Sequence, residues 1–248
     1  MDTTTRSVRI GIDGRPLIGR RSGVGRYVFE LCRQLDLILP AADFFVYSKV
    51  DIELPVVSDR WHLRLDGAPF MSRLKPAIWL KLRCGSLCAA DQIDAFWGGL
   101  SLLPRLATRV RSVSTVYDLM WRIAPQSMGG LHRFSYSMFF RGDLRRATHV
   151  AAISHGTADR LLALYGRPAD AIITPAVDQT LFQSNDRAEG GPGTGTDIRS
   201  PYLLAVATWE PRKNLELLVR TELALKTTGN DPRLLLERFL ITVCKVKA

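Results

Sequence analysis

The chain has 248 residues, of which 46% are hydrophobic and 23% are charged, and it carries a formal net charge of +10. This length allows one large domain or two small ones, and the composition is that of a soluble globular protein. No apolar run reaches the roughly 18–20 residues that a membrane-spanning helix needs, and the N-terminus lacks the apolar core of a secretory signal. We therefore expect a cytoplasmic protein.

The positive charge favours anionic partners such as nucleotides, sugar phosphates, acidic lipid headgroups or nucleic acid. No dense block of Lys and Arg accompanies the charge, and this disfavours nucleic acid. The four cysteines are too few and too scattered for a disulfide framework. Cys84 and Cys88 would share one face of a helix, but a zinc site needs two more ligands and no histidine is near them in sequence. We expect these two cysteines to be metal-free.

Short β-rich segments alternate with longer helical patterns along the first part of the chain. The predicted strands are residues 7–13, 43–48, 61–65, 93–99, 111–118, 148–154 and 171–177. The predicted helices are residues 24–35, 72–89 and 132–147, and a further helix that follows Ser154, whose side chain can cap it.

This alternation predicts the fold class and the edge at which a ligand would bind. Strands that are almost continuously apolar and alternate with helices predict a parallel sheet covered on both faces, an α/β fold. In such sheets ligands bind beyond the carboxyl ends of the strands. The candidate positions are therefore those that follow strands: residues 13–25, Gly98, Gly99, Tyr117, Asp118 and Ser154.

The domain organisation follows from one segment of unusual composition. Residues 184–201 are rich in Gly, Ser, Thr and Pro, which is typical of a linker. We expect it to separate a first domain, residues 1–183, from the beginning of a second one, residues 202–248. The second segment is shorter than an independent α/β domain usually is.

The segment IGIDGRPLIGRRSGVGRYVFEL, residues 10–31, runs from a strand through a glycine-rich loop into a helix. Glycines let a backbone approach an anion, and the amino end of the next helix adds positive potential. The loop does not match the dinucleotide fingerprint, because Val28 stands where a third glycine is required, and no Gly-Lys-Ser/Thr of a P-loop follows. Phosphate binding and a plain turn with solvated arginines both remain open here.

Two further motifs have two interpretations each. Asp118 ends a predicted strand and can either orient a sugar hydroxyl or cap a turn. Arg212 and Lys213, in the segment EPRKN, stand at the start of a predicted helix, where basic residues oppose the helix dipole. A bound phosphate would remove that conflict, and a solvated basic turn is the alternative.

Five segments together resemble a known family. GIDGRPL with SGVGRYVFEL, VSTVYDLMWRIAPQSM, ATHVAAISHGTADRLLALYG, ITPAVDQTLF and YLLAVATWEPRKNLELLV occur in the order seen in family 4 (group 1) glycosyltransferases, over roughly residues 7–220. The resemblance implies a GT-B fold, with two Rossmann-like domains facing each other across a cleft. It also implies sugar transfer with retention from a nucleotide-sugar donor, without a metal or another cofactor. The N-terminal domain would hold the acceptor and the C-terminal domain the donor.

The resemblance also assigns residues. It implies catalytic roles for Tyr117 and Asp118, substrate contacts for Gly23, Gly25 and Ser154, and donor-phosphate contacts for Arg212 and Lys213. The sequence departs from the family at Tyr117, where many members have histidine, and at Ala207 or Thr208, where some have arginine. It also lacks the Glu-rich motif, with two glutamates eight residues apart, that follows in the family.

These departures lead to the expectation of a truncated donor-binding domain, with little or no transferase activity in this chain alone. The parent enzyme would transfer a sugar, mannose by subgroup resemblance, to a surface or lipid-linked glycan. Peripheral contact with the anionic inner face of the cell membrane is expected from charge and family. The alternative is a non-catalytic glycan-binding or interaction module. A dehydrogenase is disfavoured because the dinucleotide fingerprint is absent.

Overall fold

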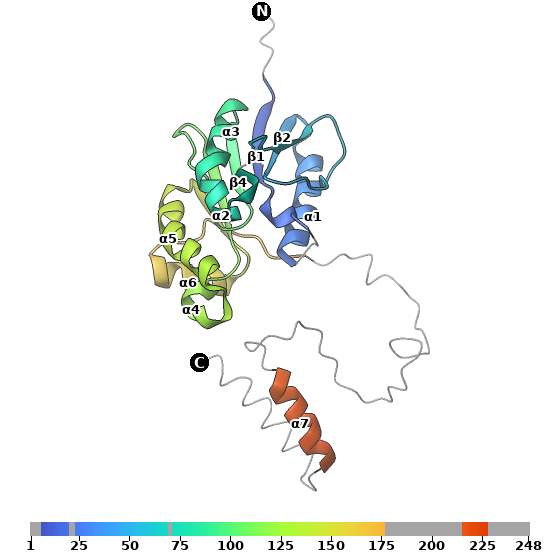
Figure 1. Cartoon of the computed structure of the whole chain (residues 1–248), viewed down its shortest axis with the longest axis vertical. Helices are drawn as coiled ribbons and strands as arrows, with labels where there is room; N and C mark the ends of the chain where they lie inside the picture. Colours follow the sequence, from blue (N-terminus) through green and yellow to red (C-terminus); the bar gives the residue numbers. More distant parts are fainter. Residues whose placement is uncertain (1–5, 20–22, 69–70, 177–214, 228–248) are drawn as a thin grey trace, which may run out of the picture. The chain divides into compact units, whose positions relative to one another are not determined.

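The computed structural model describes residues 6–19, 23–68, 71–176 and 215–227 (Figure 1). The chain divides into two compact units, Met1–Val177 and Asp178–Ala248. In the second unit the structure describes α7 (Leu215–Thr227), which confirms the helix predicted after EPRKN. The predicted linker, residues 184–201, and the strand predicted after it lie outside the described residues.

The first unit is built on a parallel sheet of seven strands in the order β3-β2-β1-β4-β5-β6-β7. This confirms the predicted α/β class, and the order is that of a Rossmann-like domain extended by one edge strand. The described strands are β1 (Val8–Asp13), β2 (Ala42–Ser48), β3 (Trp61–Leu65), β4 (Ala95–Gly98), β5 (Arg111–Val116), β6 (His149–Ala152) and β7 (Ala171–Ile172).

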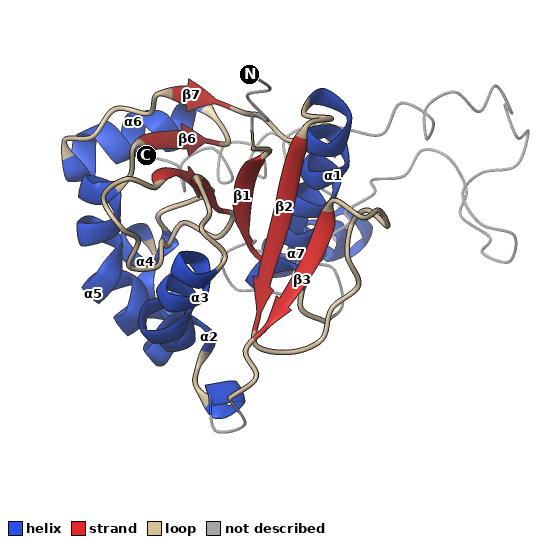
Figure 2. Cartoon of the chain, turned by 90° about the horizontal axis from the view of Figure 1, so that it is seen from above, coloured by secondary structure: helices blue, strands red, loops and turns tan. Residues whose placement is uncertain are grey.

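Alternate side chains of β2 show how the sheet is covered. Phe44 and Val46 face α1 (Gly23–Ile38), which packs on this side through Val28 and Cys32. Tyr47 points to the opposite face and joins the larger apolar core. The helical segments on that face are α2 (Pro76–Trp79), α3 (Gly85–Ala90), α4 (Met120–Ile123), α5 (Gly130–Arg146) and α6 (His155–Tyr165) (Figure 2). Within the described residues, no helix has both the length and the apolarity needed to cross a bilayer.

The helix predicted over residues 72–89 differs from the structure. A short 3-10 turn (η2, Met71–Arg73) comes first, and the continuous helix begins only at Pro76, because proline is accepted in a first turn but not inside a helix. The helix contains a π-helical turn, η3 (Leu80–Cys84), between α2 and α3. Cys84 and Cys88 do share a buried face, with their sulfur atoms 3.9 Å apart as free thiols. No group of three potential metal ligands occurs among the described residues.

The π-helical turn places a lysine in the protein interior. Lys81, whose side chain is 7% exposed, forms an ion pair with Asp143 of α5, whose side chain is 2% exposed. Lys81 Nζ also donates to the carbonyl oxygen of Leu103, 2.5 Å away, and Asp143 Oδ2 accepts from the backbone N–H of Leu103 at 3.0 Å. Arg146 contacts the second oxygen of Asp143. One buried ion pair therefore ties the α2–α3 helix, α5 and the loop after β4 together.

We predict that Asp143→Ala lowers the free energy of unfolding by about 3–5 kcal/mol, because it leaves the Lys81 ammonium buried without its counterion. Lys81→Met/Asp143→Asn removes both buried charges and keeps an acceptor for the Leu103 N–H, so it should cost less than the single change. Urea unfolding followed by tryptophan fluorescence measures both. A single variant as stable as the wild type would contradict this role.

Candidate functional site

The carboxyl ends of β1 and β4 form the switch point of the sheet, because the chain continues from these neighbouring strands toward opposite edges. The backbone is tightly packed here. Gly14 N donates to the carbonyl oxygen of Tyr47 at 2.9 Å, and a Cβ at Gly14 would lie 2.6 Å from that oxygen. A Cβ at Gly98 would lie 2.7 Å from the carbonyl oxygen of Leu102. Both positions therefore require glycine, because a side chain would collide with the neighbouring backbone.

A buried ion pair occupies the end of β1. Asp13 is fully buried, and Arg15, in the short 3-10 turn η1 (Arg15–Leu17), has a side chain that is 3% exposed. Arg15 Nε donates to Asp13 Oδ1 at 2.9 Å and Nη2 donates to Oδ2 at 2.7 Å. The backbone N–H of Arg15 also donates to Oδ1, at 3.1 Å. The carboxylate thus fixes both the turn and the plane of the guanidinium.

This pairing uses only one edge of the guanidinium. A guanidinium has five N–H donors, and the side-on fork to Asp13 employs Nε and one N–H of Nη2. No hydrogen bond among the described residues uses Nη1 of Arg15. Burial alone would lower the pKa of Arg15, but the charge of Asp13 and its hydrogen bonds outweigh burial and raise that pKa. The group is a permanent cation with a second edge available to a ligand.

A cavity of about 660 Å³ lies beside this cation, between η1, the start of α2, the loop after β4 and the start of α5. Its polar side chains are Arg15, Lys75, His132, Ser135 and Tyr136. The remaining walls are mainly apolar and include Ile18, Pro76, Ala77, Leu100 and Leu131. All four segments begin or end at the carboxyl edge of the sheet, so the cavity occupies the position predicted for a ligand.

His132 and Tyr136 form one wall of the cavity from consecutive turns of α5. Their ring centroids lie 4.9 Å apart, and Tyr136 also packs against Trp121 with centroids 4.6 Å apart. Tyr136 donates to the carbonyl oxygen of Leu100 at 3.1 Å, which holds the ring in place. Burial lowers the pKa of His132, as does the positive charge of Arg15, while Asp118 opposes the shift. The imidazole is therefore more easily deprotonated than an ordinary histidine side chain.

The two residues predicted to be catalytic make the following contacts, and their catalytic roles stay predictions. Tyr117 donates to the carbonyl oxygen of Gly99 at 2.8 Å and packs edge-on against Tyr27 of α1. Asp118 is exposed, and its Oδ1 accepts from the backbone N–H of Met120 at 3.3 Å. One carboxylate oxygen of Asp118 therefore caps the turn, which is one of the two roles predicted for this residue. The negative charge of Asp118 acts to raise the pKa of His132. The imidazole near this aspartate thus comes from α5 and not from position 117.

The residues predicted to contact substrate or donor phosphate lie in three separate segments of the chain. Gly23 and Gly25 lie in the first turn of α1 and not in a loop, and Gly25 is buried. Ser154 caps α6, because its Oγ accepts from the backbone N–H of Thr157 at 3.1 Å, which confirms the predicted cap. Arg212 and Lys213 lie outside the described residues, so their phosphate role stays a prediction.

Comparison with known proteins adds no assignment. No protein-family model matches the chain, and no curated protein matches it.

Sequence reasoning missed the polar side chains of the cavity. Arg15 fell within the candidate segment 13–25, but nothing in the pattern singled it out from the other arginines of the loop. Its spacing of two residues from Asp13, directly after a strand, was the available signal. His132 and Lys75 reach the cavity from segments far away in sequence, and only the fold brings them to Arg15.

We predict that His132 titrates below the ordinary imidazole pKa of 6.5, and that Asp118→Asn lowers its pKa further, because the carboxylate charge favours the protonated ring. NMR titration of the imidazole signals measures this, with His132→Gln to assign the resonance. Asp59→Asn, an exposed change in the loop between β2 and β3, serves as the control and should leave the pKa unchanged. An unchanged or higher pKa in Asp118→Asn would refute the assignment.

Proposed function

We propose that the first unit is the acceptor-holding domain of a retaining, nucleotide-sugar-dependent glycosyltransferase of the GT-B type. The observation that carries the proposal is the cavity of about 660 Å³ at the switch point, lined by a buried arginine with one unused edge. Its position is where parallel α/β sheets bind ligands, and its volume is in the range of small-molecule sites. The resemblance of five ordered segments to family 4 supplies the reaction.

The donor side of the proposal rests on Arg212 and Lys213. The resemblance assigns their charges to the pyrophosphate of the nucleotide-sugar. Negative charge grows on the nucleotide diphosphate as the glycosidic bond breaks, and fixed cations stabilise that charge. No metal is required in this scheme, because the two side chains replace it.

The acceptor side uses Asp118 and His132. Asp118 Oδ2 takes part in no hydrogen bond among the described residues, so it is available to a sugar hydroxyl while Oδ1 caps the turn. A neutral His132 can accept a hydroxyl proton. Tyr117, whose hydroxyl is held by Gly99, acts by positioning the strand end rather than by proton transfer.

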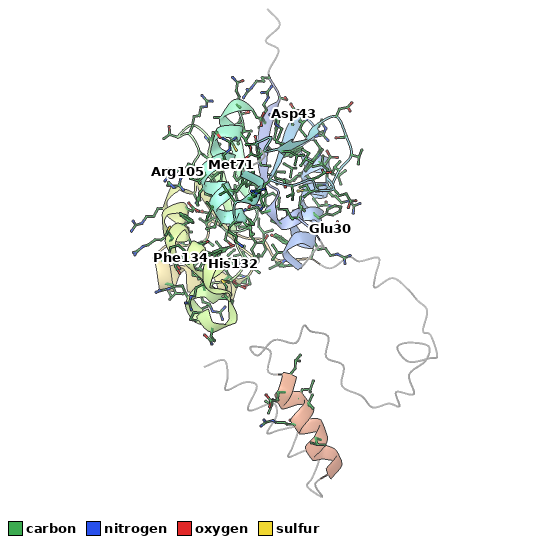
Figure 3. The ribbon with its side chains drawn as sticks, viewed as in Figure 1. Glu30, Asp43, Met71, Arg105, His132 and Phe134 are labelled. Carbon is green, nitrogen blue, oxygen red and sulfur yellow. The ribbon has the colours of Figure 1, made fainter. Side chains whose placement is uncertain are left out.

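The start of α5 favours a lipid-linked acceptor. Leu131, Phe134 and Met138 are 52%, 57% and 54% exposed, and their spacing places them along one side of the helix. Figure 3 labels Phe134 beside His132 of the same helix. The exposed Arg133 and Arg141 flank them. Apolar side chains beside arginines suit the surface of an anionic membrane. A non-catalytic glycan-binding module remains the second candidate, since the same cavity would serve it.

Calorimetric titration of the purified chain with UDP, GDP and the matching nucleotide-sugars tests the proposal. We predict binding that Arg212→Ala/Lys213→Ala weakens by at least tenfold, because two cations facing a pyrophosphate are lost.

The matched control is Arg109→Ala/Arg111→Ala, which removes the same charge from exposed positions at the amino end of β5. It should bind as the wild type does. Absence of nucleotide binding in a folded chain would overturn the transferase proposal and favour the binding module. Equal weakening in both double variants would show that only net charge matters.

A further inference from the structure

We propose that the cavity beside Arg15 recognises an amphipathic anion: an apolar body carrying one phosphate or carboxylate, which the free edge of Arg15 holds. This rests on the proposed function only in naming that molecule the acceptor; the binding site itself is argued from the described residues alone. The transferase proposal requires an acceptor but does not specify its charge.

The geometry of Arg15 gives the first reason. Asp13 neutralises the arginine from one side and orients it, while Nη1 and the second N–H of Nη2 form a parallel pair of donors on the other edge. Such a pair matches two oxygens of a carboxylate or phosphate. The side chain is 3% exposed and lines the cavity, so the ligand meets a cation already withdrawn from bulk water.

The amino end of α5 gives a second, independent reason. Its first backbone hydrogen bond runs from Arg133 N to Gly129 O at 3.0 Å, so the amides of residues 130–132 have no partner within the helix. No side chain caps this end and no acidic residue stands in its first turn. Gly129 and Gly130 line the cavity. A 17-residue helix therefore directs uncapped N–H groups and the positive end of its dipole at the same space as Arg15.

The remaining charges around the cavity agree in sign. Lys75 lines the mouth and adds a second cation. Of the acidic groups, Asp13 is engaged by Arg15, and Asp118 acts on His132 from the exposed turn before α4. A neutral His132 adds a hydrogen bond without opposing the anion.

The apolar walls decide between the sources of such an anion. Ile18, Pro76, Ala77, Leu100 and Leu131 surround the polar groups, so a free inorganic or sugar phosphate would leave these walls without a partner. An alkyl or prenyl phosphate fills them and presents one charge to Arg15. The observations thus favour the phosphate of a lipid over a fully hydrophilic anion.

The test compares Gly129→Asp with Gly129→Asn. A Cβ at Gly129 has nothing within 4 Å, and the backbone there, with φ −57° and ψ 137°, suits either residue. Asp and Asn cap a helix comparably, so both variants fold at least as well as the wild type. They differ in one negative charge beside the anion site. Calorimetry of the full chain with hexyl phosphate is the readout, with hexyl β-glucoside as neutral probe and inorganic phosphate as hydrophilic probe.

We expect hexyl phosphate to bind Gly129→Asn at least tenfold more tightly than Gly129→Asp, and hexyl glucoside to bind both alike. Inorganic phosphate should bind the wild-type chain more weakly than hexyl phosphate does. Arg15→Lys keeps the charge but loses the fork, and should weaken hexyl phosphate about fivefold or more; the Gly129 pair decides the question even if that variant does not fold.

Three results would overturn the inference: no hexyl phosphate binding to the wild-type chain, equal binding to both Gly129 variants, or hexyl glucoside binding to the wild type as tightly as hexyl phosphate. Inorganic phosphate binding as tightly as hexyl phosphate would overturn the lipid source. Hexyl phosphate contains neither sugar nor nucleotide. A chain that binds hexyl phosphate but no nucleotide diphosphate would therefore overturn the proposed function alone, and the reverse result this inference alone.

Discussion

The ion pair between Asp13 and Arg15 is the constraint on which the candidate site depends. Withdrawing a carboxylate and a guanidinium from water costs several kcal/mol each, and only close pairing with several hydrogen bonds offsets that cost. The pair meets this condition with a bidentate fork and a backbone N–H. Because Asp13 belongs to β1, an interior strand of the sheet, the cation is anchored to the sheet. When a ligand binds, the side chain of Arg15 would lose little further conformational entropy, which is the advantage of a preorganised site.

A second buried pair holds the walls of the cavity together. Lys81 and Asp143 join the α2–α3 helix to α5, and these elements supply Lys75 and His132 at their amino ends. Burial lowers the pKa of Lys81 to about 8; Asp143 opposes this shift, and the charges of Arg146 and Arg15 add to it. The charge of Arg15 therefore lowers the pKa of two groups, Lys81 in the core and His132 at the cavity.

The sequence predicted the sheet well because each strand is a short apolar run that ends at small or polar residues. The strands at residues 61–65 and 111–116 begin where expected, whereas β7 is limited to Ala171–Ile172. The π-helical turn at Leu80–Cys84 was not predictable from periodicity, since one extra residue in a turn leaves the apolar pattern almost unchanged. The location of the site, beyond the strand ends, followed from topology. Its chemistry did not, because His132 and Arg15 meet only through tertiary packing.

A crystal structure of the full chain with hexyl phosphate tests the central claim most directly. The account predicts phosphate oxygens within hydrogen-bond distance of Nη1 and Nη2 of Arg15, the alkyl chain against Ile18 and Leu100, and the fork to Asp13 unchanged. Phosphate bound elsewhere on the first unit, or an Arg15 that leaves Asp13 to reach it, would contradict the claim that a buried ion pair at the end of β1 prepares this protein to receive an anion.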